Sequence, residues 1–93
     1  MRCVVHVRKS MDFAGAHFVL RVFSLYSPEK PLSVESYASI GSLIARLTEL
    51  GIPSGILKSS LASLGLGCDA MWTNVEVARS FFGDSHERRA AVA

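Results

Sequence analysis

The sequence predicts an α+β fold: an N-terminal antiparallel β-hairpin, an antiparallel helix pair packed on it, and then a short C-terminal helix or strand. Three observations predict it. β-branched and aromatic residues fill the first third of the chain, apolar residues recur at helical spacing in the middle, and glycines and prolines separate the segments. Because 93 residues make a chain of one-domain length, we expect 1–93 to form a single small domain, with 84–93 as a frayed tail.

Two strands are expected at the start of the chain, over 3–8 and over about 17–26. Side chains alternate between the two faces of a strand, so antiparallel pairing must match one apolar set with the other. This register predicts one apolar face, made of Cys3, Val5, Val7, Phe18, Leu20 and Val22. The opposite face then gathers Val4, His6, Arg8, His17, Val19 and Arg21.

The segment 10–15 between these strands contains the aspartate and glycine typical of a hairpin loop. It also contains Met11 and Phe13, whose apolar side chains are costly to leave in water. We therefore expect both side chains to fold back on the core or to meet a partner.

Two prolines place a loop at 27–31, because proline interrupts both a strand ladder and a helix interior. A helix is expected from Ser33, which can act as its N-cap, to a stop at Gly51. A second, shorter helix starts near Ser54 and ends at Gly65. Very few residues join the two helices, so they are expected to be neighbours in space.

The stretch 72–82 fits two structures. Thr73 followed by Glu76 fits a helix-capping box, which favours a helix here. Thr73, Val75 and Val77 also alternate with polar residues, as a strand would, and such a strand would extend the hairpin.

Composition and charge exclude several classes of protein. The net charge of +2 is too small to indicate a nucleic-acid-binding protein by itself. No segment approaches the roughly 20 apolar residues of a membrane span, and the apolar stretch at the N-terminus is cut short by His6, so we expect no signal peptide. A cytoplasmic location without membrane contact is the resulting expectation.

Catalytic and metal-binding patterns are weak in this sequence. Cys3 and His6 fall on opposite faces of one strand, so they cannot act together. Cys3 and Cys68 lie in no metal-ligand spacing, and we expect two buried free thiols. We therefore predict no catalytic residue, no metal and no cofactor, and a small-ligand-binding or catalytic role ranks third among the functions considered.

The favoured function is a small, non-catalytic interaction or regulatory protein that acts as a homodimer. The second strand carries more apolar surface than one sheet face can hide, and an oligomer interface would bury the excess. The candidate interface residues are Phe23, Leu25 and Tyr26.

The alternative is a nucleic-acid-binding regulator that uses a basic face of the hairpin. Such a patch could hold a phosphate backbone, another anion or an acidic partner. Its candidate residues are Arg8, His17 and Arg21, with His6 nearby.

Overall fold

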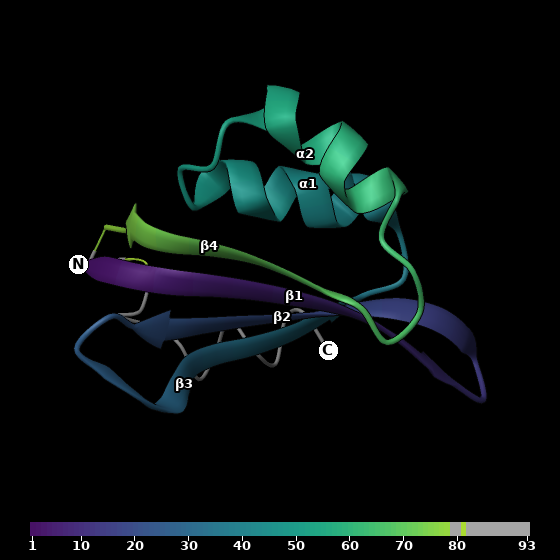
Figure 1. Cartoon of the computed structure of the whole chain (residues 1–93), viewed down its shortest axis with the longest axis horizontal. Helices are drawn as coiled ribbons and strands as arrows, with labels where there is room; N and C mark the ends of the chain where they lie inside the picture. The colour runs from purple at the N-terminus through teal and green to yellow at the C-terminus, as the bar shows by residue number, and fades with distance from the viewer. Residues whose placement is uncertain (79–80, 82–93) are drawn as a thin grey trace.

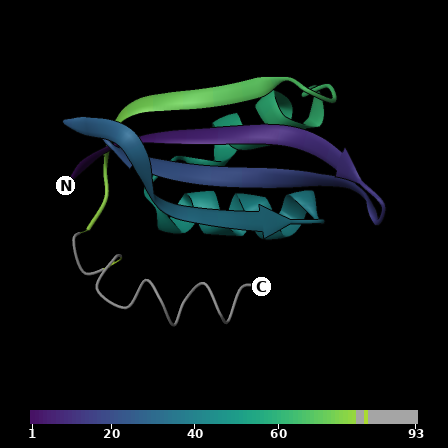
Figure 2. The ribbon, with the colours of Figure 1, turned by 90° about the horizontal axis from the view of Figure 1, so that it is seen from below.

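Four antiparallel strands and two helices make up the computed structural model of the chain, which describes residues 1–78 and 81 (Figure 1). In chain order they are β1 (Arg2–Asp12), β2 (Gly15–Ser24), β3 (Ser27–Tyr37), α1 (Ile40–Glu49), α2 (Ser54–Ala62) and β4 (Asp69–Glu76). The strands lie in the order β3-β2-β1-β4. Both helices cover the same face of the sheet, with α1 behind β3 and α2 behind β4 and β1 (Figure 2).

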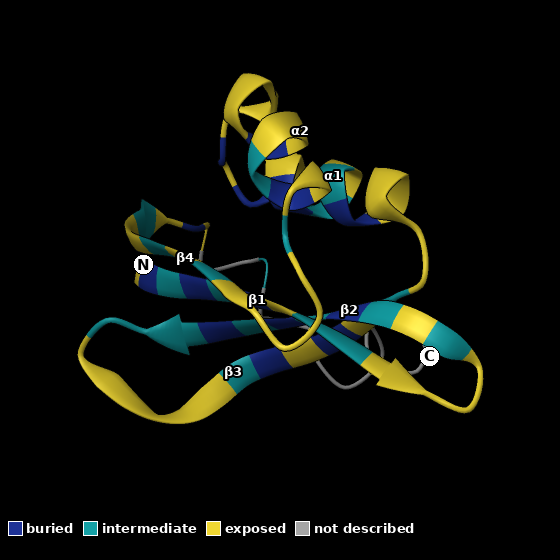
Figure 3. Ribbon diagram, turned by 45° about the vertical axis from the view of Figure 1, so that its right-hand side comes forward, coloured by how far each residue is buried: buried dark blue, intermediate teal, exposed yellow. Residues whose placement is uncertain are grey.

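The predicted register of the first hairpin is confirmed. Val5 lies opposite Val22, and Val7 lies opposite Leu20. The six residues expected on the apolar face are all buried, and they pack under buried helix residues such as Leu43 and Leu57 (Figure 3).

The predicted loop at 27–31 and the helix start at Ser33 are wrong, because both segments belong to β3. Prolines are tolerated there since β3 is an edge strand, whose outward N–H groups need no partner strand. Ser33 pairs with Val22 of β2, so cross-strand pairing overrides the local capping pattern. The helix α1 instead begins after Ser39, whose Oγ accepts a hydrogen bond from the Ser42 amide.

The glycine stop after α1 is confirmed. Gly51 has a φ of 103°, the left-handed conformation that glycine adopts without steric cost. The Ile52 amide then donates to the Leu47 carbonyl, and both side chains are buried. The second helix begins at Ser54 as expected.

Residues 69–76 form the strand β4, so the helix favoured over 72–82 is wrong for 72–76, and residues 79–80 and 82 lie outside the described part of the chain. In β4, Trp72 lies opposite Val5 and Val75 lies opposite Cys3, with a bulge between them where Asn74 adopts a φ of 59°. Pairing with β1 satisfies backbone groups that the capping box could not reach, which explains why the strand wins. The tail expected over 84–93 lies outside the described residues.

A buried ion pair ties the edge strand β3 to α1. Arg46 donates from Nε and Nη2 to the two carboxylate oxygens of Glu35, at 2.9 Å each. Tyr37 also donates its hydroxyl to Glu35, and the ring of Phe81 lies 4.1 Å from the Arg46 guanidinium carbon. Burial, with the hydrogen bond to Glu35 as a second cause, raises the pKa of Tyr37 above its ordinary value.

Two further expectations concern membranes and thiols. Among the described residues, neither helix has the length and apolar character needed to cross a bilayer. Cys3 is buried as expected, but Cys68 is exposed, because it lies in the turn before β4 rather than under a helix.

Candidate interaction surface

One face of the sheet carries no helix of the described part of the chain, and we call it the open face. Figure 2 shows this face toward the viewer, with both helices behind it. It collects alternate residues of all four strands, because His6 lies opposite both Arg21 and Met71, and Arg21 lies opposite Val34. Its residues include Val4, His6, Arg8, His17, Val19, Arg21, Phe23, Val34, Ser36, Asp69 and Met71.

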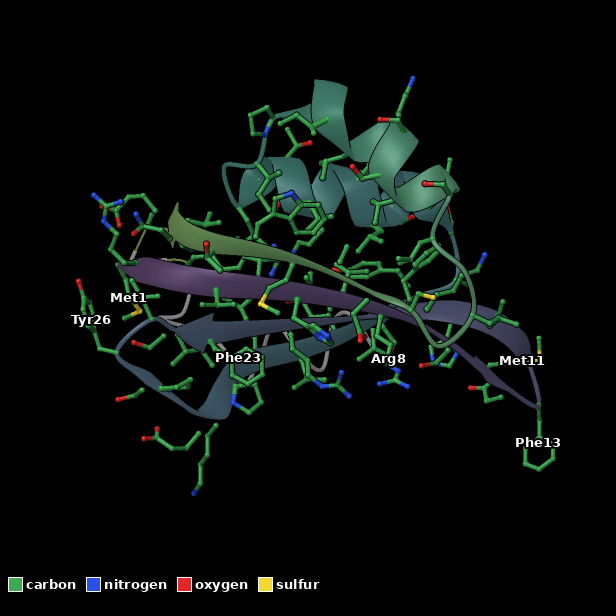
Figure 4. All side chains as sticks on the ribbon, in the orientation of Figure 1. Met1, Arg8, Met11, Phe13, Phe23 and Tyr26 are labelled. Carbon is green, nitrogen blue, oxygen red and sulfur yellow. The ribbon has the colours of Figure 1, made fainter. Side chains whose placement is uncertain are left out.

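The open face is apolar along much of its width. Val34 on β3 and Met71 on β4 are exposed, and Val4, Val19 and Phe23 on the central strands are half-buried. In Figure 4 the Phe23 ring lies on the side of the sheet away from the helices. Single exposed apolar residues are ordinary, but here every strand contributes an apolar side chain to the same face, around a polar centre formed by Arg21 and His6.

The basic residues expected on this face are brought together, but with acidic partners. Nε2 of His6 lies 3.1 Å from Oδ1 of Asp69, and Nη1 of Arg8 lies 3.9 Å from the same oxygen. Nδ1 of His17 lies 3.7 Å from Oδ2 of Asp12. Within the described residues, only Arg21 of the four predicted basic residues has no ion-pair partner.

The sequence did not reveal that Asp69 and Asp12 lie beside these basic residues. Asp69 lies opposite Arg8 only when 69–76 is a strand, and the capping pattern of Thr73 and Glu76 favoured a helix there. Asp12 was assigned to the loop, whereas β1 extends to it and pairs it with Gly15. Extending the strand alternation past residue 8 would have put Asp12 near His17.

The three residues expected at a dimer interface take two different positions. Phe23 lies on the open face, near the end of β2. Leu25 and Tyr26 form the turn between β2 and β3, with Leu25 half-buried and Tyr26 exposed. Tyr26 therefore lies at one end of the molecule, beside the end of the open face (Figure 4).

Both edges of the sheet carry features that hinder pairing with another strand. Pro28 and Pro31 interrupt the outer edge of β3, and the bulge at Asn74 distorts β4. Prolines and bulges are the usual means by which edge strands avoid further pairing. Contact through the open face is therefore favoured over contact through an edge.

The hairpin of β1 and β2 extends beyond the rest of the sheet as an arm. Pairing of β1 with β4 ends at Arg8 and Asp69, and pairing of β2 with β3 ends at Phe18 and Tyr37. At the tip of the arm, Phe13 is fully exposed, and Met11 is exposed beside it. Of the two fates expected for these side chains, folding back on the core is wrong.

A cleft of about 240 Å³ lies at the base of this arm, next to the end of β3. Alanine and glycine residues of the arm line one side, together with Asp12 and His17. Ser36, Tyr37 and Ala38 line the other side.

No group of three histidine, cysteine, aspartate or glutamate residues within 1–78 and 81 has the arrangement of a metal site.

The chain matches no protein-family model, no curated protein and no solved structure.

Proposed function

We propose that this protein is a non-catalytic interaction module that forms a homodimer by packing the open faces of two copies together. The observation that supports this proposal best is that every strand contributes an apolar side chain to the open face. Val34 and Met71 are exposed at its two edges, on either side of Arg21 and His6. Packed sheets lie about 10 Å apart with their inner side chains interdigitated. A second copy offers the same apolar side chains and can bury them from water.

The charges of the open face also favour a second copy over a nucleic acid. The two arginines of this face, Arg8 and Arg21, are matched in number by two aspartates, Asp69 and, at the arm, Asp12. A phosphate backbone selects a net positive surface, whereas a surface of balanced charge can meet itself without repulsion. In a two-fold contact, Arg21 can reach an aspartate of the second copy, since it has no ion-pair partner among the described residues.

The area of the open face can be compared with the area that standard protein interfaces bury. Four strands of 8 to 11 residues cover about 600 Å² per copy, from the usual strand spacing and rise. Stable interfaces of standard size bury about 800 Å² per partner. We therefore expect a dimer that dissociates in the micromolar range.

The test compares exposed apolar residues on the two sides of the molecule. Met71 on the open face and Ile56 on α2 are similarly exposed, at 59% and 54%. Val34 on the open face and Ile40 on α1 are matched at 39% and 37%. Sedimentation velocity from about 1 to 500 μM should show that Met71→Asp and Val34→Asp abolish dimerisation, since each buries a charge in the interface. Ile56→Asp and Ile40→Asp should leave dimerisation unchanged.

Two results would contradict the proposal. A wild-type chain that sediments as a monomer at every concentration removes the homodimer. Salt-sensitive binding to DNA or RNA that is lost in Arg8→Ala with Arg21→Ala would instead support the nucleic-acid alternative.

A further inference from the structure

We infer that each copy in the homodimer inserts Phe13 into the cleft at the base of the other copy's arm. This inference rests on the proposed homodimer and adds a specific contact to it. Its two parts are an aromatic side chain with nothing to cover it and a cleft at the base of the same hairpin, with apolar and polar groups in its lining.

Phe13 has the position of an anchor. It is the first residue of the tight turn between β1 and β2, and its side chain is fully exposed. In Figure 4 the ring points away from the helices, toward the side of the open face. A buried aromatic side chain dominates many interfaces because it removes a large apolar area from water.

The cleft has the size and chemistry for a phenyl ring. A cavity of about 150 Å³ with apolar walls can hold benzene, and this cleft measures about 240 Å³. Its walls include the small side chains of Ala16 and Ala38 and the rings of His17 and Tyr37, and Asp12 and Ser36 are its polar lining residues. Aromatic rings pack well on one another in offset or edge-to-face contacts.

Phe13 cannot fill the cleft of its own chain in this conformation. The Ala14 amide donates to Oδ1 of Asp12 at 2.8 Å, which fixes the turn with Phe13 directed outward. The nearest source of an equivalent ring is therefore a second copy.

The symmetry of a two-fold dimer makes the exchange reciprocal. When the two-fold axis runs parallel to the strands, both arms project at the same end of the dimer. Each Phe13 then lies near the other copy's cleft, because ring and cleft are separated by only a few residues on the arm. The same orientation keeps the two open faces against each other, so the arm contact continues the proposed interface.

The experiment measures dimerisation of three arm variants by sedimentation velocity. Phe13→Ala should raise the dissociation constant on the order of 100-fold, from at least about tenfold for each of two equivalent contacts. Ala38→Gln, which fills the cleft from its far wall, should weaken the dimer in the same direction. Met11→Ala, at the other exposed apolar residue of the arm, should have little effect.

A direct measurement locates the ring. In a mixture of ¹³C-labelled and unlabelled protein, isotope-filtered NOEs should connect the Phe13 ring of one copy to the Ala38 methyl group of the other. These NOEs should disappear in Phe13→Ala.

The outcomes separate this inference from the proposed function. If the wild type never dimerises, the homodimer fails and the inference fails with it. If Met71→Asp dissociates the dimer but Phe13→Ala does not, the homodimer stands and the arm exchange is wrong. If Phe13→Ala leaves the dimer intact but abolishes binding to vesicles of mixed neutral and anionic phospholipid, the ring contacts lipid instead and the inference is overturned.

Discussion

The two faces of the sheet use the same strands but differ in what covers them. On β2, Val22 lies under the helices and is buried, whereas Val19 three residues earlier lies on the open face and is half-buried. Both are valines in the same strand, so local β propensity does not distinguish them. The difference comes from the helices, which the chain places on one side only.

The ion pairs on the two faces also differ in how deeply they are buried. Glu35 and Arg46 form a bidentate, buried pair beside the helices, whereas Arg8 and Asp69 lie 3.9 Å apart with both side chains largely exposed. A buried charge that loses its partner is left without solvent, and an exposed charge is simply hydrated. The covered face therefore depends on complete pairing, and the open face is free to exchange partners.

The largest expected effect comes from breaking the buried pair. Arg46→Met should lower the free energy of unfolding by about 3–5 kcal/mol, because Glu35 stays buried without its main partner. Arg8→Met, the matched change on the open face, should cost less than about 1 kcal/mol. Urea denaturation at pH 7 measures both, and equal losses would contradict the contrast between the faces. The double variant Glu35→Leu with Arg46→Met should recover much of the lost stability.

Truncating the two valines of β2 gives an intermediate effect. Val22→Ala should cost about 2 kcal/mol, since it leaves a cavity under the helices. Val19→Ala should cost less than about 1 kcal/mol when the protein is dilute enough to be a monomer. At concentrations that populate the proposed dimer, the cost of Val19→Ala should rise, whereas that of Val22→Ala should not. Thermal unfolding at several protein concentrations checks this dependence.

The smallest effect concerns pH. The pKa of Tyr37 is raised by burial and by Glu35, so the folded state holds the phenolic proton more tightly than the unfolded chain does. Its contribution is fully present below the ordinary pKa of 10.0 and is lost as the pH rises above that value. Tyr37→Phe should cost about 1 kcal/mol near pH 7, from the lost hydrogen bond. This difference from the wild type should narrow between pH 10 and 11.5 in urea denaturation. Parallel pH profiles of the two proteins would show that folding does not raise the pKa of Tyr37.

The pairing of the first hairpin and the end of the first helix could be predicted from the sequence. The apolar residues at alternate positions of 3–7 and 18–22 define a register that buries all six of them on one face, with Val4 and Val19 left on the other. Gly51 marks the end of the first helix because a left-handed residue is needed there. These features are local, or they concern two neighbouring segments, so the sequence contains the information.

The candidate interaction surface could be predicted only in part. The alternation put His6, Arg8, His17 and Arg21 on one face, which the structure confirms. The alternation did not place Val34 on this face, because Pro28 and Pro31 indicated a loop where the strand β3 forms. It did not reveal Asp69 or Met71, because a capping pattern competed with strand pairing.

The sequence alone determined which residues alternate, where the first helix ends and where the second begins, because these follow from backbone geometry over a few residues. Only the tertiary structure decided that 27–37 and 69–76 become the edge strands of the sheet. Each edge strand forms because a neighbouring strand offers unpaired backbone groups, and that gain outweighs a proline or a capping box. The same long-range packing decided which face the helices cover, and so which side chains stay exposed on the open face.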